Sequence, residues 1–165
     1  MKTRGRVKEK ISVQSDSVKD TVYAGRVIAR HLRESDIVCL FGDLGSGKTV
    51  LAKGIAEGLG IEKNKVISPT FVIIRRYTGK KILFHFDLYR LSASGDIAGL
   101  GYEEYFYDNG ISVIEWPERL GSLMPEEYLS VRLDIRERRK RLISLSGFGG
   151  RYKQMIKEID EDLGA

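Results

Sequence analysis

The chain has 165 residues, 42% of them hydrophobic, which is enough for one domain with a single core. Its formal net charge of +5 is modest for a nucleic-acid-binding protein and does not by itself identify a partner. The single cysteine, Cys39, lies in an apolar run, which excludes an internal disulfide framework and indicates a buried thiol. No apolar run is long enough to span a bilayer, and the N-terminus is polar and basic without an apolar signal core. We therefore expect a soluble cytoplasmic protein with no membrane partner.

The first part of the chain alternates strand and helix patterns. The predicted elements are a strand at 10–13, a helix from about 18 to 33, a strand at 37–41 and a helix at 50–59. Ser17 opens a capping-box spacing at the start of the first helix. The apolar residues on one face of this helix are Val18, Val22, Ala29 and Leu32. We expect that face to pack on the sheet.

The second part of the chain is predicted to contain two hairpins and three further elements. The hairpins pair 72–77 with 81–86 and 129–135 with 142–145, and between them lie a loop at 92–101, a short helix at 102–107 and a buried strand at 111–114. A final helix follows the glycine-rich residues 147–150. Its apolar face comprises Tyr152, Met155, Ile156, Ile159 and Leu163.

Residues 42–49, Gly-Asp-Leu-Gly-Ser-Gly-Lys-Thr, fit the phosphate-binding pattern G-x-x-x-x-G-K-[ST] in full. The motif requires a strand before it and a helix after it, and both are predicted. Its glycines allow positive φ and a close approach of backbone N–H groups to phosphate oxygens. Lys48 can reach the β and γ phosphates, and the Thr49 hydroxyl is placed for Mg²⁺. The motif therefore predicts binding of a nucleoside triphosphate.

Two acidic residues follow apolar runs and are candidates for the magnesium-linked acid. Asp87 follows 82–86 and Glu115 follows 111–114, and a parallel sheet presents such strand ends to its ligands. Either acid can serve the metal, or one can serve the metal while the other orients the attacking water. An isolated acid at a strand end is more often a helix cap or a surface ion pair. The two together with the loop motif favour function.

The same residues argue against a GTPase. Residues 64–67 lack the aspartate of an N-K-x-D guanine motif, and residues 87–90 lack the glycine of a D-x-x-G switch. A small-molecule kinase stays possible, since such enzymes use the same loop with arginines on a lid. Arg75, Arg76 and Arg90 are candidates for that role. For Arg75 and Arg76 a place as solvated charges on a strand edge is at least as good an interpretation.

Four motifs in order resemble the TsaE family, formerly YjeE. They are Gly-Asp-Leu-Gly-Ser-Gly-Lys-Thr at 42–49, Ser-Pro-Thr-Phe at 68–71, His-Phe-Asp-Leu-Tyr-Arg-Leu at 85–91 and Ile-Glu-Trp-Pro-Glu at 114–118. The resemblance implies a small bacterial ATPase of the tRNA threonylcarbamoyladenosine machinery. We expect a single-domain α/β P-loop NTPase over 1–165, with a mainly parallel sheet, antiparallel hairpin additions and helices on both faces. Within it the family core spans 11–146, a glycine-rich hinge 147–150 and a C-terminal helix 151–165.

The resemblance also implies roles for individual residues. Lys48, Asp87 and Glu115 are implied to be catalytic, and Thr49 with Glu115 to hold Mg²⁺. The residues implied to contact ATP are Asp43, Leu44, Gly45, Ser46, Gly47, Lys48, Thr49, Thr70 and Trp116. Ser68 and Thr70 match a switch-like segment, and Ser15 or Ser17 aligns near a polar position at the nucleotide. For Trp116 a core or interface anchor is an equal alternative.

The resemblance implies partners as well. The family ATPase works with the subunits TsaD and TsaB on a tRNA substrate, and whether it contacts tRNA directly stays open. The basic run 136–141 fits tRNA binding, but a solvated hairpin tip is the better interpretation because no aromatic residue interrupts the run. His31 and His85 are assigned no chemistry.

These patterns together predict a Mg²⁺-dependent ATPase that is slow alone, since no arginine finger is evident, and is activated by its partners. The alternatives are a self-sufficient small-molecule kinase and a nucleotide-sensing binding module whose hydrolysis is incidental. A kinase would transfer the γ-phosphoryl group to an acceptor other than water. A binding module would keep its partner function after Asp87→Ala had abolished hydrolysis.

Overall fold

The computed structural model describes residues 9–67, 73–91 and 94–164. Its elements are β1 (Lys10–Ser15), α1 (Val18–His31), β2 (Ile37–Phe41), α2 (Lys48–Gly58), η1 (Lys63–Lys65), β3 (Ile74–Thr78), β4 (Ile82–Asp87), α3 (Ser94–Ala98), α4 (Tyr102–Phe106), β5 (Gly110–Glu115), η2 (Pro117–Leu123), β6 (Tyr128–Ile135), β7 (Arg141–Phe148) and α5 (Gly150–Gly164). Every strand predicted from the sequence is present in the described residues. None of the described helices is both long and apolar enough to cross a membrane.

One seven-stranded sheet organises these elements, in the order β1-β7-β6-β2-β5-β4-β3. The four central strands β6, β2, β5 and β4 are parallel. β3 pairs antiparallel with β4 at one edge. At the other edge β7 pairs antiparallel with β6, and β1 pairs antiparallel with β7. The two predicted hairpins, β3–β4 and β6–β7, are confirmed. Because β2, β4 and β5 run parallel, their carboxyl ends meet at one edge of the sheet.

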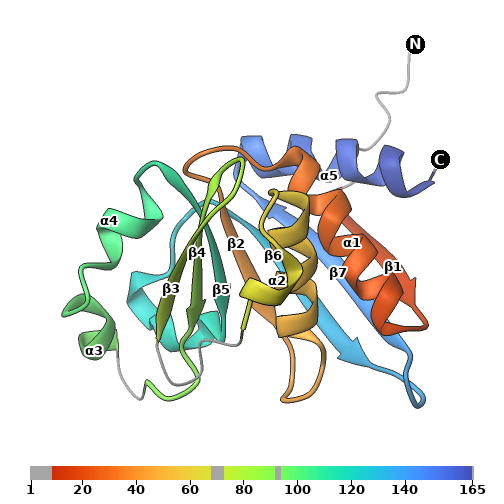
Figure 1. Ribbon diagram of the computed structural model, residues 1–165, viewed down its shortest axis with the longest axis horizontal. Coiled ribbons are helices and arrows are strands. Elements are labelled where there is room, and N and C mark those ends of the chain that lie inside the picture. The colour runs from red at the N-terminus through yellow and green to blue at the C-terminus, as the bar shows by residue number, and fades with distance from the viewer. Residues whose placement is uncertain (1–8, 68–72, 92–93, 165) are drawn as a thin grey trace, which may run out of the picture.

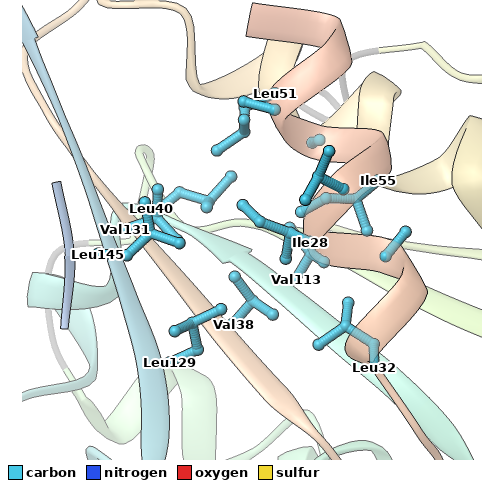
Figure 2. Packing of buried hydrophobic residues seen from close by; sticks show 14 of the residues in the cluster. Ile28, Leu32, Val38, Leu40, Leu51, Ile55, Val113, Leu129, Val131 and Leu145 are labelled. Carbon is cyan, nitrogen blue, oxygen red and sulfur yellow. The ribbon is translucent and has the colours of Figure 1, made fainter. Parts of the chain in front are cut away.

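Helices cover both faces of the sheet, as predicted. Helices α1 and α2 lie side by side across one face, with α5 beside them near the β1–β7 edge, and α3 and α4 lie near the opposite end (Figure 1). Side chains of α1 and α2, such as Ile28 and Leu51, pack on alternate strand residues such as Val38 and Val113 (Figure 2). The other strand residues, among them Cys39, face a second cluster with η2, α3 and α4. The chain is therefore a layered α/β domain, and its cysteine is buried as expected.

The buried face of α1 agrees with the prediction in part. Ala29 and Leu32 are buried as predicted, but Val18 is 68% exposed, and the helix also buries Ala24, Gly25, Val27 and Ile28. The reason is that α1 packs on α2 as well as on the sheet. A Cβ atom at Gly25 would come within 2.6 Å of the backbone oxygen of Leu51, so only glycine permits this approach. The predicted start of the helix is confirmed, because the Ser17 hydroxyl accepts a hydrogen bond from the Asp20 N–H at 3.1 Å.

The C-terminal helix α5 packs into the same core as α1 and α2. Tyr152, Met155, Ile156 and Ile159 are buried and Leu163 partly so, which confirms the predicted apolar face. The Tyr152 hydroxyl accepts a hydrogen bond from the Ile37 N–H, 2.9 Å away, at the start of β2. Its helix neighbour Arg151 pairs with Asp36 at 2.7 Å. α5 is thus attached to the strand that leads into residues 42–49.

The segment 92–101, predicted as a loop, contains a short helix. α3 spans Ser94–Ala98, and its Ile97 is 2% exposed in the second apolar cluster. The helix could not be recognised from the sequence, because a single buried side chain among polar residues gives no periodic pattern. The predicted helix at 102–107 is confirmed as α4.

Candidate nucleotide-binding site

Residues 42–49, hereafter the glycine-rich loop, connect the carboxyl end of β2 to the first turn of α2. Gly42, Gly45 and Gly47 have φ values of 148°, 79° and 106°, a region that L side chains rarely adopt. At Gly42 a Cβ atom would also lie 2.6 Å from the backbone oxygen of Leu133, so the close approach of β6 requires glycine. Gly47 caps α2 without a side-chain hydrogen bond. The first amides of α2 are therefore not capped by a side chain, as an anion-binding helix terminus requires.

The side chain of Lys48 folds back over the glycine-rich loop. Its Nζ donates to the backbone oxygens of Gly42 at 2.6 Å and Asp43 at 2.9 Å, and it lies 4.2 Å from the centre of the Trp116 ring. Burial lowers the pKa of Lys48, and the nearby carboxylates, Glu115 foremost, oppose this effect. Backbone oxygens hold the ammonium weakly compared with a phosphate. The lysine is thus positioned to exchange these contacts for phosphate oxygens.

The two predicted acids lie side by side. Asp87 and Glu115 are paired positions at the ends of the parallel strands β4 and β5, and both are buried. The Thr49 hydroxyl donates to Glu115 Oε1 at 2.8 Å, whereas Asp87 Oδ1 accepts a hydrogen bond from the Tyr89 N–H at 3.1 Å. The sequence left the roles of the two acids open. The contact to Thr49 distinguishes them, since only Glu115 touches the hydroxyl predicted to bind the metal.

This donor set fits Mg²⁺. A hydroxyl and a carboxylate are oxygen ligands of the kind Mg²⁺ prefers, and the ion commonly takes only one or two protein ligands beside water and phosphate oxygens. The described residues contain no group of three or more His, Cys, Asp or Glu side chains that could hold a metal on their own. The arrangement therefore suits a metal that arrives with a nucleotide better than a permanently bound metal.

His85 is a site residue that the sequence analysis missed. Its Nε2 lies 2.6 Å from Glu115 Oε2, and the ring is completely buried. Side chains alternate along a strand, so His85 lies on the same face of β4 as Asp87, two residues further on. The two-residue spacing from Asp87 could have indicated from the sequence that His85 faces the site. Its contact with Glu115, however, depends on β5 lying next to β4.

A cleft of about 380 Å³ gathers most of the predicted residues, and we call it the phosphate cleft. It is lined by Leu44, Gly45, Gly47, Lys48, Thr49, Val50, Asp87, Tyr89, Glu115 and Trp116. Trp116 has a positive φ of 58°, and its ring centre lies 5.0 Å from that of Tyr89. The Trp116 ring also packs against the second apolar cluster. Both interpretations of this tryptophan, cleft residue and core anchor, describe part of its environment.

A second cleft of about 560 Å³ lies on the other side of the glycine-rich loop, and we call it the hairpin cleft. It is lined by Asp16, Ser17, Val18, Lys19, Thr21, Gly45, Ser46, Gly47, Val50, Arg138, Arg139 and Arg141. Arg141 joins its two sides, because its Nε donates to the oxygen of Ser46 at 3.0 Å and its Nη2 to that of Gly45 at 3.2 Å. The tip of the β6–β7 hairpin thus lies beside the loop. Of the two candidate serines, Ser17 lines this cleft and Ser15 does not.

The remaining described candidates, Asp43 among them, line neither cleft. Thr70 and Ser68 lie outside the described residues. Arg75 and Arg76 belong to the edge strand β3, and Arg90 follows β4. None of these three arginines lines the phosphate cleft or the hairpin cleft.

Comparisons with known proteins agree with this site. A family model described as "Threonylcarbamoyl adenosine biosynthesis protein TsaE" matches residues 15–143. The tRNA threonylcarbamoyladenosine biosynthesis protein TsaE of Treponema pallidum is 41% identical over 73% of this chain and 89% of its own length. The protein of the same name from Bacillus subtilis is 35% identical over 86% of this chain and 88% of its own length.

A solved structure also resembles the fold. The crystal structure of YdiB from Bacillus subtilis has a TM-score of 0.78 to this chain at 28% sequence identity, and the match covers 93% of this chain and 95% of that one. The range matched by the family model contains the glycine-rich loop, both acids and His85. The chain therefore belongs to the TsaE family, which takes part in tRNA threonylcarbamoyladenosine biosynthesis.

Proposed function

We propose that this protein binds Mg²⁺-ATP and hydrolyses it as the ATPase component of tRNA threonylcarbamoyladenosine synthesis in the cytoplasm, working with TsaB and TsaD. The observation that carries the proposal is the convergence of Lys48, Thr49, Asp87 and Glu115 on one cleft at the carboxyl ends of parallel strands. Ligands of open α/β sheets bind at this edge. The residue spacing of the loop motif indicates that this ligand is a nucleoside triphosphate.

The proposed roles follow from the contacts. The amides of the glycine-rich loop and the N-terminus of α2 bind the phosphates, and Lys48 binds the outer ones. Thr49 and Glu115 would hold the Mg²⁺, which supplies charge neutralisation at the β and γ phosphates when bound. Asp87 is left for the attacking water, whose proton its carboxylate accepts while the bond to the leaving ADP oxygen breaks. The assignment of different roles to Glu115 and Asp87 rests on the Thr49–Glu115 hydrogen bond of 2.8 Å.

Slow turnover by the isolated protein is part of the proposal. Among the described residues that line the phosphate cleft, Lys48 is the only cation. Charge that develops on the transferred phosphoryl group is commonly stabilised by an added arginine, which contributes several orders of magnitude in rate. We therefore expect partner binding to complete or close the cleft.

The test is ATP hydrolysis by the protein alone and with purified TsaB and TsaD, together with the variants Lys48→Ala and Glu115→Gln. We expect low activity alone, an increase of at least tenfold with both partners, and loss of that increase in both variants. Calorimetry with ATP, in Mg²⁺ and in EDTA, separates a binding defect from a catalytic one. Transfer of the γ-phosphoryl group to a metabolite, with no effect of the partners, would contradict the proposal and identify a kinase instead.

A further inference from the structure

We propose that His85 is a positioning residue of the magnesium site: its ring holds the Glu115 carboxylate so that one oxygen stays directed at Thr49 and the metal. The inference rests on the proposed function of this site. It adds a role for His85, which belongs neither to the loop motif nor to the pair of acids.

The strand geometry brings the two side chains together. In β4, Leu83, His85 and Asp87 point to the face covered by α1 and α2, while Phe84 and Phe86 point to the other. In the neighbouring strand β5, Val113 and Glu115 share the α1–α2 face. Because His85 is paired with Val113 in the parallel register, Glu115 is its diagonal neighbour. The contact is thus imposed by two adjacent central strands, not by a mobile loop.

The hydrogen bond has a defined direction. An ionised carboxylate can only accept, so His85 Nε2 is the donor in the 2.6 Å contact to Glu115 Oε2. The other ring nitrogen, Nδ1, is buried and has no hydrogen-bond partner among the described residues. Among the described residues the ring is thus held through Nε2, which carries the proton of this hydrogen bond.

The two oxygens of Glu115 therefore have separate tasks. Oε2 receives the histidine proton, and Oε1 receives the Thr49 hydroxyl proton at 2.8 Å. The Thr49 hydroxyl and Glu115 Oε1 are the groups that would hold Mg²⁺ or one of its waters, and the ion would supply charge neutralisation at the phosphates. The hydrogen bond from His85 uses the other oxygen, Oε2, and would therefore be kept. It keeps the carboxylate from rotating away, as outer partners of metal ligands do in other proteins.

Packing alone explains the histidine poorly. His85 is 0% exposed between strands rich in aliphatic and aromatic residues, where an apolar side chain would avoid an unpaired nitrogen. Its one described polar side-chain contact is Glu115. This single hydrogen bond offsets the cost of burying the imidazole, and its partner, Glu115, is the predicted metal ligand.

The test compares His85→Phe, which keeps a ring but loses the donor, with His85→Gln, which keeps an N–H donor. The matched control is His31→Gln at the chain's other histidine, which bonds to Asp162. The measurement is Mn²⁺ affinity by electron paramagnetic resonance in the presence of a non-hydrolysable ATP analogue. Affinity for the analogue in EDTA is measured in parallel. Loss of an outer partner typically weakens metal binding about 10- to 100-fold.

We expect His85→Phe to weaken Mn²⁺ binding by about 10- to 100-fold with unchanged analogue affinity in EDTA, while His85→Gln stays within about threefold of wild type. Wild-type Mn²⁺ affinity in His85→Phe, alongside weakened binding in Glu115→Gln, would overturn the inference and leave the proposed function standing. If the unmodified protein showed no metal-dependent binding of the analogue, the proposed function would fail and the inference with it.

A second measurement does not depend on the folding of His85→Phe. With only two histidines in the chain, ring ¹⁵N spectra of the wild type and of His31→Gln assign the His85 signals. We expect a proton on Nε2 and a signal that shifts when Mg²⁺ is added to the analogue-bound protein. A proton on Nδ1 alone, or a signal that ignores the metal, would contradict a positioning role.

Discussion

Arg141 connects the basic hairpin tip to the glycine-rich loop, and its removal should weaken ATP binding. The side chain donates to the oxygens of Ser46 and Gly45 at 3.0 and 3.2 Å, and it is half-buried. Taking about 0.5–1 kcal/mol for each of these partly solvated bonds gives about 1–2 kcal/mol in total. Without them, ATP must order the loop and the hairpin as it binds. We therefore expect Arg141→Ala to raise the Kd for Mg²⁺-ATP about 5- to 30-fold in calorimetric titrations.

The matched control is Arg136→Ala, which removes the same charge from the same hairpin but does not border the hairpin cleft. It should change the Kd by less than about twofold, and Arg141→Lys should fall between the two because an ammonium cannot span both carbonyls. Equal losses in Arg136→Ala and Arg141→Ala would show that overall charge matters and not the two hydrogen bonds. An unchanged Kd in Arg141→Ala would refute the reasoning.

Two further predictions concern single side chains. Burial raises the pKa of Tyr152 to about 12, so its contribution to stability is complete below pH 10 and is lost as the pH rises from 10 to 12. In urea unfolding from pH 10 to 12, the free energy of unfolding of the wild type should therefore fall by about 3 kcal/mol more than that of Tyr152→Phe. At pH 7, Tyr152→Phe should be about 1–3 kcal/mol less stable than the wild type, because the Ile37 N–H loses its hydrogen-bond partner. Parallel curves of stability against pH for the two proteins would contradict this. Trp116 is the chain's only tryptophan, and the centre of its ring lies 4.2 Å from Lys48 Nζ. Phosphate binding should draw the ammonium away from the ring and so change the tryptophan fluorescence. An unchanged emission spectrum at ATP concentrations that calorimetry shows to be saturating would disprove this contact.

Much of the fold was predictable because its signals are local. Five-residue apolar runs such as 37–41 identified central strands, since strands covered on both faces need little polar alternation. The capping serine and the apolar face of the final helix were equally local, and both are confirmed. The shift of the buried face of α1 was not predictable in this way. It depends on Gly25 and on the approach of α2, a second helix that no pattern within α1 describes.

For the candidate site, the glycine-rich loop and the two strand-end acids could be predicted from local sequence patterns. Backbone sterics restrict the loop's positive φ values to glycine, and parallel strands deliver their final residues to one edge, so neither needs knowledge of distant contacts. The groups that surround them follow from the folding of the whole chain. His85 meets Glu115 from 30 residues away and Arg141 meets Ser46 from 95 residues away. Such pairs are set by strand order, register and hairpin placement, which arise from packing the whole chain and leave no periodic trace in either partner's own segment.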